Sequence, residues 1–149
     1  MALNVLASRH PMLQVRFREI DGQPEQGIDP EAVVPLEVFD AADLDDALLK
    51  QRVADEYARP FDLSCAPLIR ASVYRLPDRQ CVLLLVIDHI ICDGWSYWQL
   101  IEELGRIMDP SKASTAAETF EGEEHRYFSY VRHQREWLGN KRDEKQLTY

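Results

Sequence analysis

The chain has 149 residues, 46% of them hydrophobic and 29% charged, which is the composition of one globular domain rather than of a disordered or fibrous segment. The longest apolar run, residues 81–87, is too short to cross a bilayer, so we expect neither a membrane span nor a signal peptide. A net charge of −9 disfavours a nucleic-acid partner, and three widely spaced cysteines are typical of a reduced, cytoplasmic protein.

The first predicted element is a strand over residues 12–20, in which apolar and polar side chains alternate. Asp21 and Gly22 then form a turn signal. The polar residues from there to Pro30 are expected to be irregular.

A short strand is predicted over residues 33–39, at the edge of a sheet because Pro35 lacks an amide hydrogen. The spacing of apolar residues changes to a helical one over residues 44–57. Either Asp40 or Asp43 is expected to cap this helix.

Two segments, residues 68–76 and 80–88, predict a hairpin because a three-residue turn, Pro-Asp-Arg, separates them. Every residue of the second segment from 81 to 87 is apolar. A strand without alternation is typically buried on both faces. We therefore expect this strand in the middle of the sheet, with helices covering it.

The remaining predicted elements are helical. Residues 95–108 carry apolar side chains at helical spacing, Trp98 among them, and residues 123–137 form a second amphipathic pattern. The small and polar residues between them, 111–122, are typical of a loop. The predicted fold class is therefore α/β, with a mixed sheet covered by helices.

Polar side chains suited to chemistry follow the predicted central strand, in the segment DHIICDGWS at residues 88–96. A rigid strand end can place His89 accurately, and imidazole exchanges protons readily at physiological pH. Gly94 permits a backbone turn that a side chain would resist. Trp95 and Trp98 are expected to supply apolar walls that exclude water.

Simpler explanations exist for the same residues. His89 can be a structural histidine, and Asp93 can cap the helix that follows it. Asp88, His89 and Asp93 could in principle bind a metal, but ligands from a single loop rarely converge, so we predict no metal site. The other histidines are interpreted as structural or surface residues: His10, His125 and His133.

Four segments, in this order, resemble the motifs of the condensation domains of nonribosomal peptide synthetases. LASRHPMLQVRF (6–17) is similar to the family's RHxxLRxxF element, and RPFDLSCAPLIRASVYRL (59–76) is similar to PFDLxxxPLxR. DHIICDGWS (88–96) is similar to HHxxxDG, and YFSYVRHQREWL (127–138) with the final QLTY resembles the stretch that closes the first lobe. The resemblance covers nearly the whole chain.

The resemblance implies a chloramphenicol-acetyltransferase-like fold, in which two similar lobes form a V and the active site lies in a tunnel between them. Residues 1–149 are then a single partial condensation domain, the amino-terminal lobe. We expect it to lack the family's first elements and the whole carboxy-terminal lobe. Such a lobe should be inactive as isolated material.

The family's reaction joins two carrier-bound substrates. The acceptor amine attacks the donor thioester, which gives an amide and a free thiol. The resemblance implies no directly bound cofactor, because the phosphopantetheine arms of the donor and acceptor carrier proteins act as substrates. The other expected partners are an adjacent adenylation domain and the second lobe of the same domain.

The resemblance also implies residue roles. His89 matches the second histidine of the motif and would act as a general base, or would hold the amine and the tetrahedral oxyanion by hydrogen bonds. Asp93 matches the motif aspartate, an expected ion-pair partner of Arg9. Gly94 matches the glycine that leaves room for the pantetheine arm.

Two departures from the motifs leave other functions open. Gln14 stands where the family has an arginine, and Asp88 replaces the first histidine. Asp88, Asp93 and Ser96 also satisfy DxxxxDxxS, the motif of heterocyclisation domains, which form thiazoline or oxazoline rings. The intact HxxxDG favours amide formation. A third hypothesis is a catalytically degenerate lobe that only docks carrier proteins.

Overall fold

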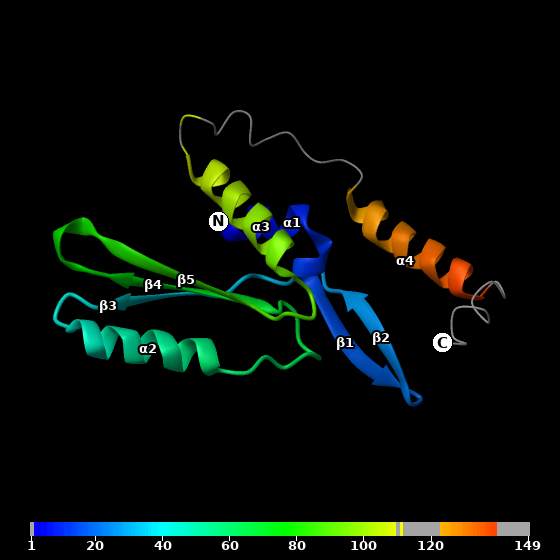
Figure 1. Ribbon diagram of the computed structural model, residues 1–149, viewed down its shortest axis with the longest axis horizontal. Helices are drawn as coiled ribbons and strands as arrows, with labels where there is room; N and C mark the ends of the chain where they lie inside the picture. Colours follow the sequence, from blue (N-terminus) through cyan, green and yellow to red (C-terminus); the bar gives the residue numbers. More distant parts are fainter. Residues whose placement is uncertain (1, 110, 112–122, 140–149) are drawn as a thin grey trace, which may run out of the picture.

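The computed structural model describes residues 2–109, 111 and 123–139 of the chain (Figure 1). Four α-helices, two short 3₁₀ segments and five strands make up these residues. In chain order they are α1 (Ala2–Arg9), η1 (Pro11–Gln14), β1 (Val15–Ile20), β2 (Gln23–Ile28), β3 (Leu36–Asp40), α2 (Asp46–Ala58), β4 (Ile69–Arg75), η2 (Pro77–Arg79), β5 (Cys81–Ile87), α3 (Gly94–Met108) and α4 (Glu123–Gly139).

The first two strands, β1 and β2, form an antiparallel hairpin of their own. Asp21 and Gly22 both have positive φ, 52° and 74°, which matches the right-handed twist of a two-residue hairpin turn. The predicted turn is confirmed. The expectation that residues 23–28 are irregular is wrong, because pairing with β1 holds this polar segment as a strand.

A mixed three-stranded sheet forms the centre of the fold, in the order β3-β4-β5. The parallel partner of β4 is β3, and its antiparallel partner is β5. The predicted hairpin is confirmed, with η2 as its turn. The predicted mixed sheet with helices is also confirmed: Figure 1 shows α2 along one side of this sheet, and α1 with α3 on the other.

The position predicted for β5 is wrong. Among the described strands β5 lies at the edge, and β4 lies in the middle. The β4 residues Ile69, Ala71 and Tyr74 are at most 2% exposed, whereas Leu83 of β5 is 43% exposed. An apolar run favours a strand, but its partners decide whether both faces are covered.

The hydrophobic core lies between the sheet and the helices α1 and α3. It contains Leu6 and Leu13 from the start of the chain, Leu85 from β5, and Leu100 and Leu104 from α3. The predicted helix 95–108 is confirmed within one residue, but Trp98, expected on its buried face, is 69% exposed. This core fixes the end of β5 and the start of α3 relative to each other.

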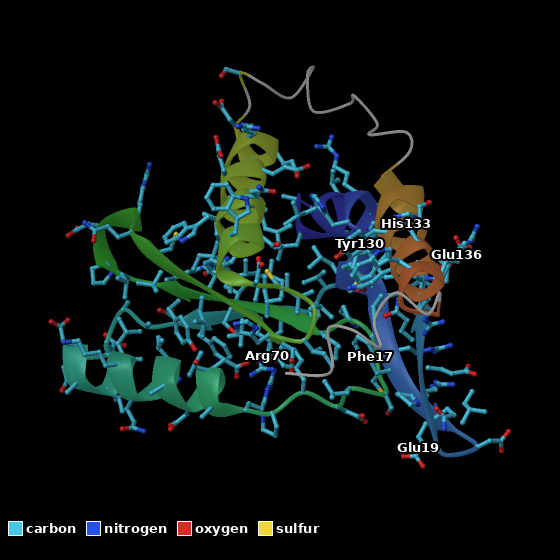
Figure 2. All side chains as sticks on the ribbon, turned by 45° about the vertical axis from the view of Figure 1, so that its right-hand side comes forward. Phe17, Glu19, Arg70, Tyr130, His133 and Glu136 are labelled. Atoms are coloured by element: carbon cyan, nitrogen blue, oxygen red, sulfur yellow. The ribbon has the colours of Figure 1, made fainter. Side chains whose placement is uncertain are left out.

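The helix α2 is attached to the sheet by polar contacts. Asp45 caps it by accepting a hydrogen bond from the Leu48 amide at 2.8 Å, so the predicted caps, Asp40 and Asp43, are wrong. Near the other end of α2, Arg70 of β4 donates a hydrogen bond to the Glu56 carboxylate at 2.9 Å (Figure 2). In the described part of the chain, no helix is both long and apolar enough to span a membrane.

Candidate functional site

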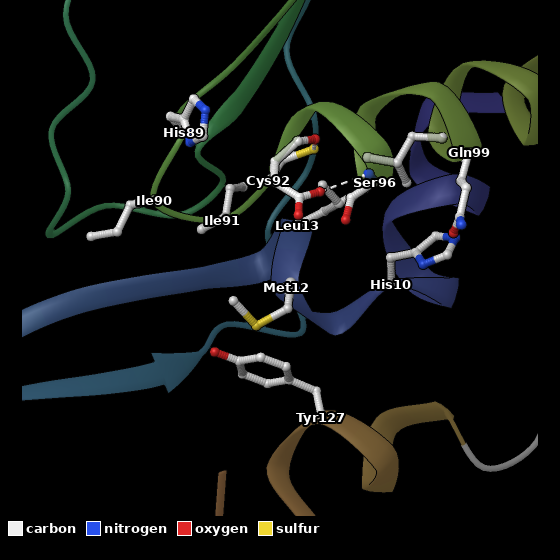
Figure 3. Close-up of a pocket in the computed structure, with 12 residues that line it drawn as sticks. His10, Met12, Leu13, His89, Ile90, Ile91, Cys92, Ser96, Gln99 and Tyr127 are labelled. Atoms are coloured by element: carbon white, nitrogen blue, oxygen red, sulfur yellow. Dashed lines mark hydrogen bonds between the residues drawn. The ribbon is translucent and has the colours of Figure 1, made fainter. Parts of the chain in front are cut away.

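A tight turn at the end of β5 sets the position of His89. The Asp88 carboxylate accepts a hydrogen bond from the Ile90 amide at 3.0 Å, and the Asp88 carbonyl accepts one from the Ile91 amide at 3.2 Å. Ile91 is 9% exposed and packs in the core, while His89 is exposed. The turn therefore presents an imidazole to solvent from a fixed backbone (Figure 3).

Asp93 is the N-cap residue that precedes the helix α3. Its carboxylate accepts a hydrogen bond from the Ser96 amide at 2.8 Å, which confirms the capping interpretation. The Ser96 backbone bond, more than any other contact, holds the pKa of Asp93 below its ordinary value of 3.8, and the nearby His89 ring adds to this effect. The carboxylate is therefore ionised and already used as a cap.

The ion pair expected between Asp93 and Arg9 is not formed. Arg9 instead bonds Glu103 of α3 at 2.9 Å, and the His10 Nε2 atom lies 2.6 Å from the other Glu103 oxygen. Glu103 lies about one turn after the buried Leu100, on the side of α3 that contacts α1. The Asp93 carboxylate instead binds the Ser96 amide at the start of α3. Because 94 positions separate Arg9 from Glu103, no local pattern could have identified this carboxylate.

Gly94 is the first residue of α3, and a Cβ at this position would meet no atom within 4 Å. Its φ does not fall in the left-handed region, so the predicted need for a glycine turn here is wrong. The space beside Gly94 leaves room for an approaching group. Whether a pantetheine arm uses it stays a prediction.

Cys92 lies between His89 and Asp93 but has no features of a nucleophile. Burial, and secondarily the charge of Asp93, raise the pKa of its thiol above 9.0. The protonated sulfur contacts the Asp93 carbonyl at 3.4 Å. A thiol in this state reacts weakly, because the thiolate is the reactive form.

A hollow of about 400 Å³ lies beside these residues and brings part of the predicted site together. His89, Asp93 and Ser96 line it, whereas Asp88, Gly94 and Arg9 are not among its lining residues. Residues that were not predicted as part of the site also line the hollow, among them Met12 of η1, Gln99 of α3 and Tyr127 of α4. Figure 3 shows Tyr127 facing Met12 across the hollow.

The walls of the hollow are not the predicted ones. Trp95 and Trp98 are 76% and 69% exposed and do not line it. Apolar side chains of the core, Leu13, Ile91 and Leu100, form the walls instead. The two tryptophans fall on the outer side of α3 because its Leu100–Leu104 side packs inward.

No group of three or more histidine, cysteine or acidic side chains that could hold a metal ion occurs among the described residues. His89 is the exposed imidazole that lines the hollow. It can accept or donate a proton, or hydrogen-bond a polar group that enters beside it. The neighbouring carboxylates are occupied by backbone amides, Arg9 or His10.

Comparisons with known proteins agree on one family. A family model described as "Condensation domain" matches residues 1–149. One of the linear gramicidin synthase proteins of Brevibacillus parabrevis is 34% identical over 99% of the chain. Surfactin synthase subunit 2 from Bacillus subtilis is 44% identical over 69% of it. The chain spans 3% of the length of each of these relatives.

Solved structures lead to the same family. A structure that describes condensation-domain-mediated chain release from the enacyloxin polyketide synthase has a TM-score of 0.64 and 31% identity, over 74% of this chain and 23% of that one. A four-domain nonribosomal peptide synthetase bound to AMP and glycine has a TM-score of 0.66 and 28% identity, over 70% of this chain and 8% of that one.

Proposed function

Because the chain belongs to the condensation-domain family, we propose that it catalyses amide-bond formation between carrier-bound substrates in a nonribosomal peptide synthetase. Membership confirms the predicted fold class, a lobe of the chloramphenicol-acetyltransferase-like, CoA-dependent acyltransferase fold. Condensation domains of peptide synthetases are acyl or peptidyl transferases. The observation that carries the proposal is the exposed imidazole of His89, fixed at the end of β5 and beside a hollow.

The proposed reaction uses the acceptor amine as nucleophile. Its nitrogen lone pair attacks the carbon of the donor thioester, a C–N bond forms, and the C–S bond breaks to release the thiol. The nitrogen loses one proton in this step. His89 takes that proton, or hydrogen-bonds the amine and the oxyanion while solvent takes it, and the departing sulfur receives a proton to give the thiol.

The proposal assigns the partners in the same way. Donor and acceptor carrier proteins deliver the substrates on phosphopantetheine arms, and an adenylation domain loads them. A second lobe of the domain faces the hollow and completes the tunnel. Three free cysteines, at positions 65, 81 and 92, support a reducing cytoplasmic setting.

Ring formation is the less favoured function. Asp88 and Asp93, two residues of the heterocyclisation motif, accept backbone amides at 3.0 and 2.8 Å, so both carboxylates have structural roles in the turn and the helix cap. The gramicidin and surfactin relatives are peptide synthetases. Product mass distinguishes the two functions, because a ring lacks one further water.

Replacement of His89 tests the proposal. In the full-length synthetase, His89→Ala should lower dipeptide formation by about 10²- to 10⁴-fold, the usual contribution of a general acid or base. Aminoacyl loading of the carriers should stay intact. Product and loaded carriers are measured by mass spectrometry.

The matched control is His133→Ala, which removes an exposed imidazole from α4. It should leave dipeptide formation unchanged. Undiminished dipeptide from His89→Ala overturns the proposal. Loaded carriers that bind normally but give no product, even with His89 in place, identify a degenerate docking lobe.

A further inference from the structure

The hollow beside His89 is larger than proton transfer requires. Its volume of about 400 Å³ lies within the range of roughly 300–1,000 Å³ that is typical of small-molecule pockets. It extends from His89 toward Gln99 and His10 (Figure 3). The amine needs contact only with His89, so the remaining space can hold another part of a substrate.

The walls of this space are suited to an apolar group. Leu13, Ile91 and Leu100 are at most 9% exposed and are fixed in the core. Met12 is half-buried and faces the ring of Tyr127. A methionine and an aromatic ring can adapt to apolar side chains of different shapes.

The wall that carries Met12 is held in place by Glu103. The Glu103 carboxylate binds Arg9 at 2.9 Å and His10 at 2.6 Å, just before Met12 in the chain. These contacts join the start of η1 to α3, on which Gln99 lies. The hollow is thus preorganised, which lowers the entropic cost of binding.

The charges around the hollow disfavour acidic ligands. Among the described residues on its lining, Asp93 is the acidic one and none is lysine or arginine, and the Glu103 carboxylate lies 2.6 Å from the His10 ring. The charge on Glu103 is neutralised by Arg9, whereas that on Asp93 is exposed to solvent. An acidic side chain would be repelled here, and an uncharged one would not.

We propose that this hollow binds the side chain of the acceptor amino acid and selects bulky, uncharged side chains. This rests on the proposed function, because condensation is what brings the acceptor amine to His89. In that step the nitrogen lies between the imidazole and the thioester carbon, so the acceptor α-carbon is nearer to the residues around His89 than the donor α-carbon is. The acceptor side chain leaves from that α-carbon and enters the hollow.

Filling the hollow tests the proposal. The full-length synthetase is given a constant donor and an acceptor carrier loaded chemically with alanine, phenylalanine or aspartate. Met12→Trp should lower the phenylalanine-to-alanine ratio of condensation rates by about tenfold, because the indole occupies the space of the phenyl ring. Gln99→Trp fills the hollow from the α3 side and should act in the same direction. Since Gln99 is exposed, this second variant tests the proposal even if Met12→Trp does not fold.

The matched control is Met108→Trp, because Met108 is 60% exposed near the end of α3 and does not line the hollow. It should keep the wild-type ratio. Three results would overturn the proposal. They are an unchanged ratio in folded Gln99→Trp, a change in donor rather than acceptor preference, and wild-type condensation that is as fast with aspartate as with phenylalanine. If His89→Ala still abolishes product, such a result leaves the proposed function intact.

Discussion

The buried guanidinium of Arg70 attaches the end of α2 to β4. It is 4% exposed, bonds the Glu56 carboxylate at 2.9 Å and the Glu56 carbonyl at 2.8 Å, and also bonds the Arg59 carbonyl. Its guanidinium carbon lies 4.1 Å from the centre of the Phe61 ring. Removal of this side chain would leave the Glu56 carboxylate, which is 13% exposed, with Arg59 at 2.9 Å as its remaining ion-pair partner.

Arg70→Met should therefore lower the free energy of unfolding by about 3 kcal/mol, since one partner of a buried ion pair is lost. Urea unfolding measures this value. The control is Arg106→Met, which breaks the ion pair between Arg106 and Glu102. Their side chains are 61% and 67% exposed, respectively. It should cost less than about 1 kcal/mol, and equal losses in the two variants would contradict the structural role of Arg70.

At the scale of elements, Glu103 joins α1 and η1 to α3. Burial raises the pKa of this carboxyl. The hydrogen bonds and charges of His10 and Arg9 together lower it by more, so the pKa lies below the ordinary 4.5. The ionised form is thus favoured by folding. Its contribution is fully present above pH 4.5 and is lost as the pH falls through the pKa of the folded state.

Glu103→Gln should lower the free energy of unfolding at neutral pH and weaken its decrease below pH 4.5. Urea unfolding at a series of pH values checks this. Glu102→Gln is the matched control on the same helix, because its side chain is 67% exposed. A variant at 103 that keeps the wild-type acid dependence would show that this carboxylate does not link the helices.

In the described chain, β3 and β5 lie at the two edges of the central sheet, and both leave apolar side chains exposed. Leu83 is 43% exposed, and Leu36 and Val38 on β3 are 50% and 48% exposed. By their register, Val38 and Leu83 both lie beside Val73 of β4. Apolar strand edges promote association between copies, despite the net charge of −9.

Leu83→Lys should therefore reduce self-association of the 149-residue chain, because a charged side chain at a strand edge opposes pairing. Light scattering over a concentration series measures it. Val33→Lys is the control, since Val33 is 63% exposed but lies outside the strands. If both variants reduce self-association equally, the change in net charge explains the effect, and the exposed edge strand β5 does not.

Several short-range features of the chain, and its family, were predictable from the order of its residues. The helix at 94–108, its cap Asp93 and the Asp21-Gly22 turn depend on contacts between neighbouring residues, so local patterns were sufficient to predict them. The motif around His89 indicated the family, and the family model over residues 1–149 confirms it. Predicting such features does not require knowing which distant residues lie near them in the fold.

Contacts between residues far apart in the chain could not be predicted from local patterns. The apolar run of β5 predicted a strand, but pairing placed β4 in the centre instead. Arg9 pairs with Glu103 and not with the predicted Asp93. Trp98 lies on the exposed side of α3 because the opposite side of this helix packs in the core. The physical reason is common to these cases: burial and ion pairing depend on the neighbours that the fold supplies, and residues 94 positions apart leave no periodic signal in the chain.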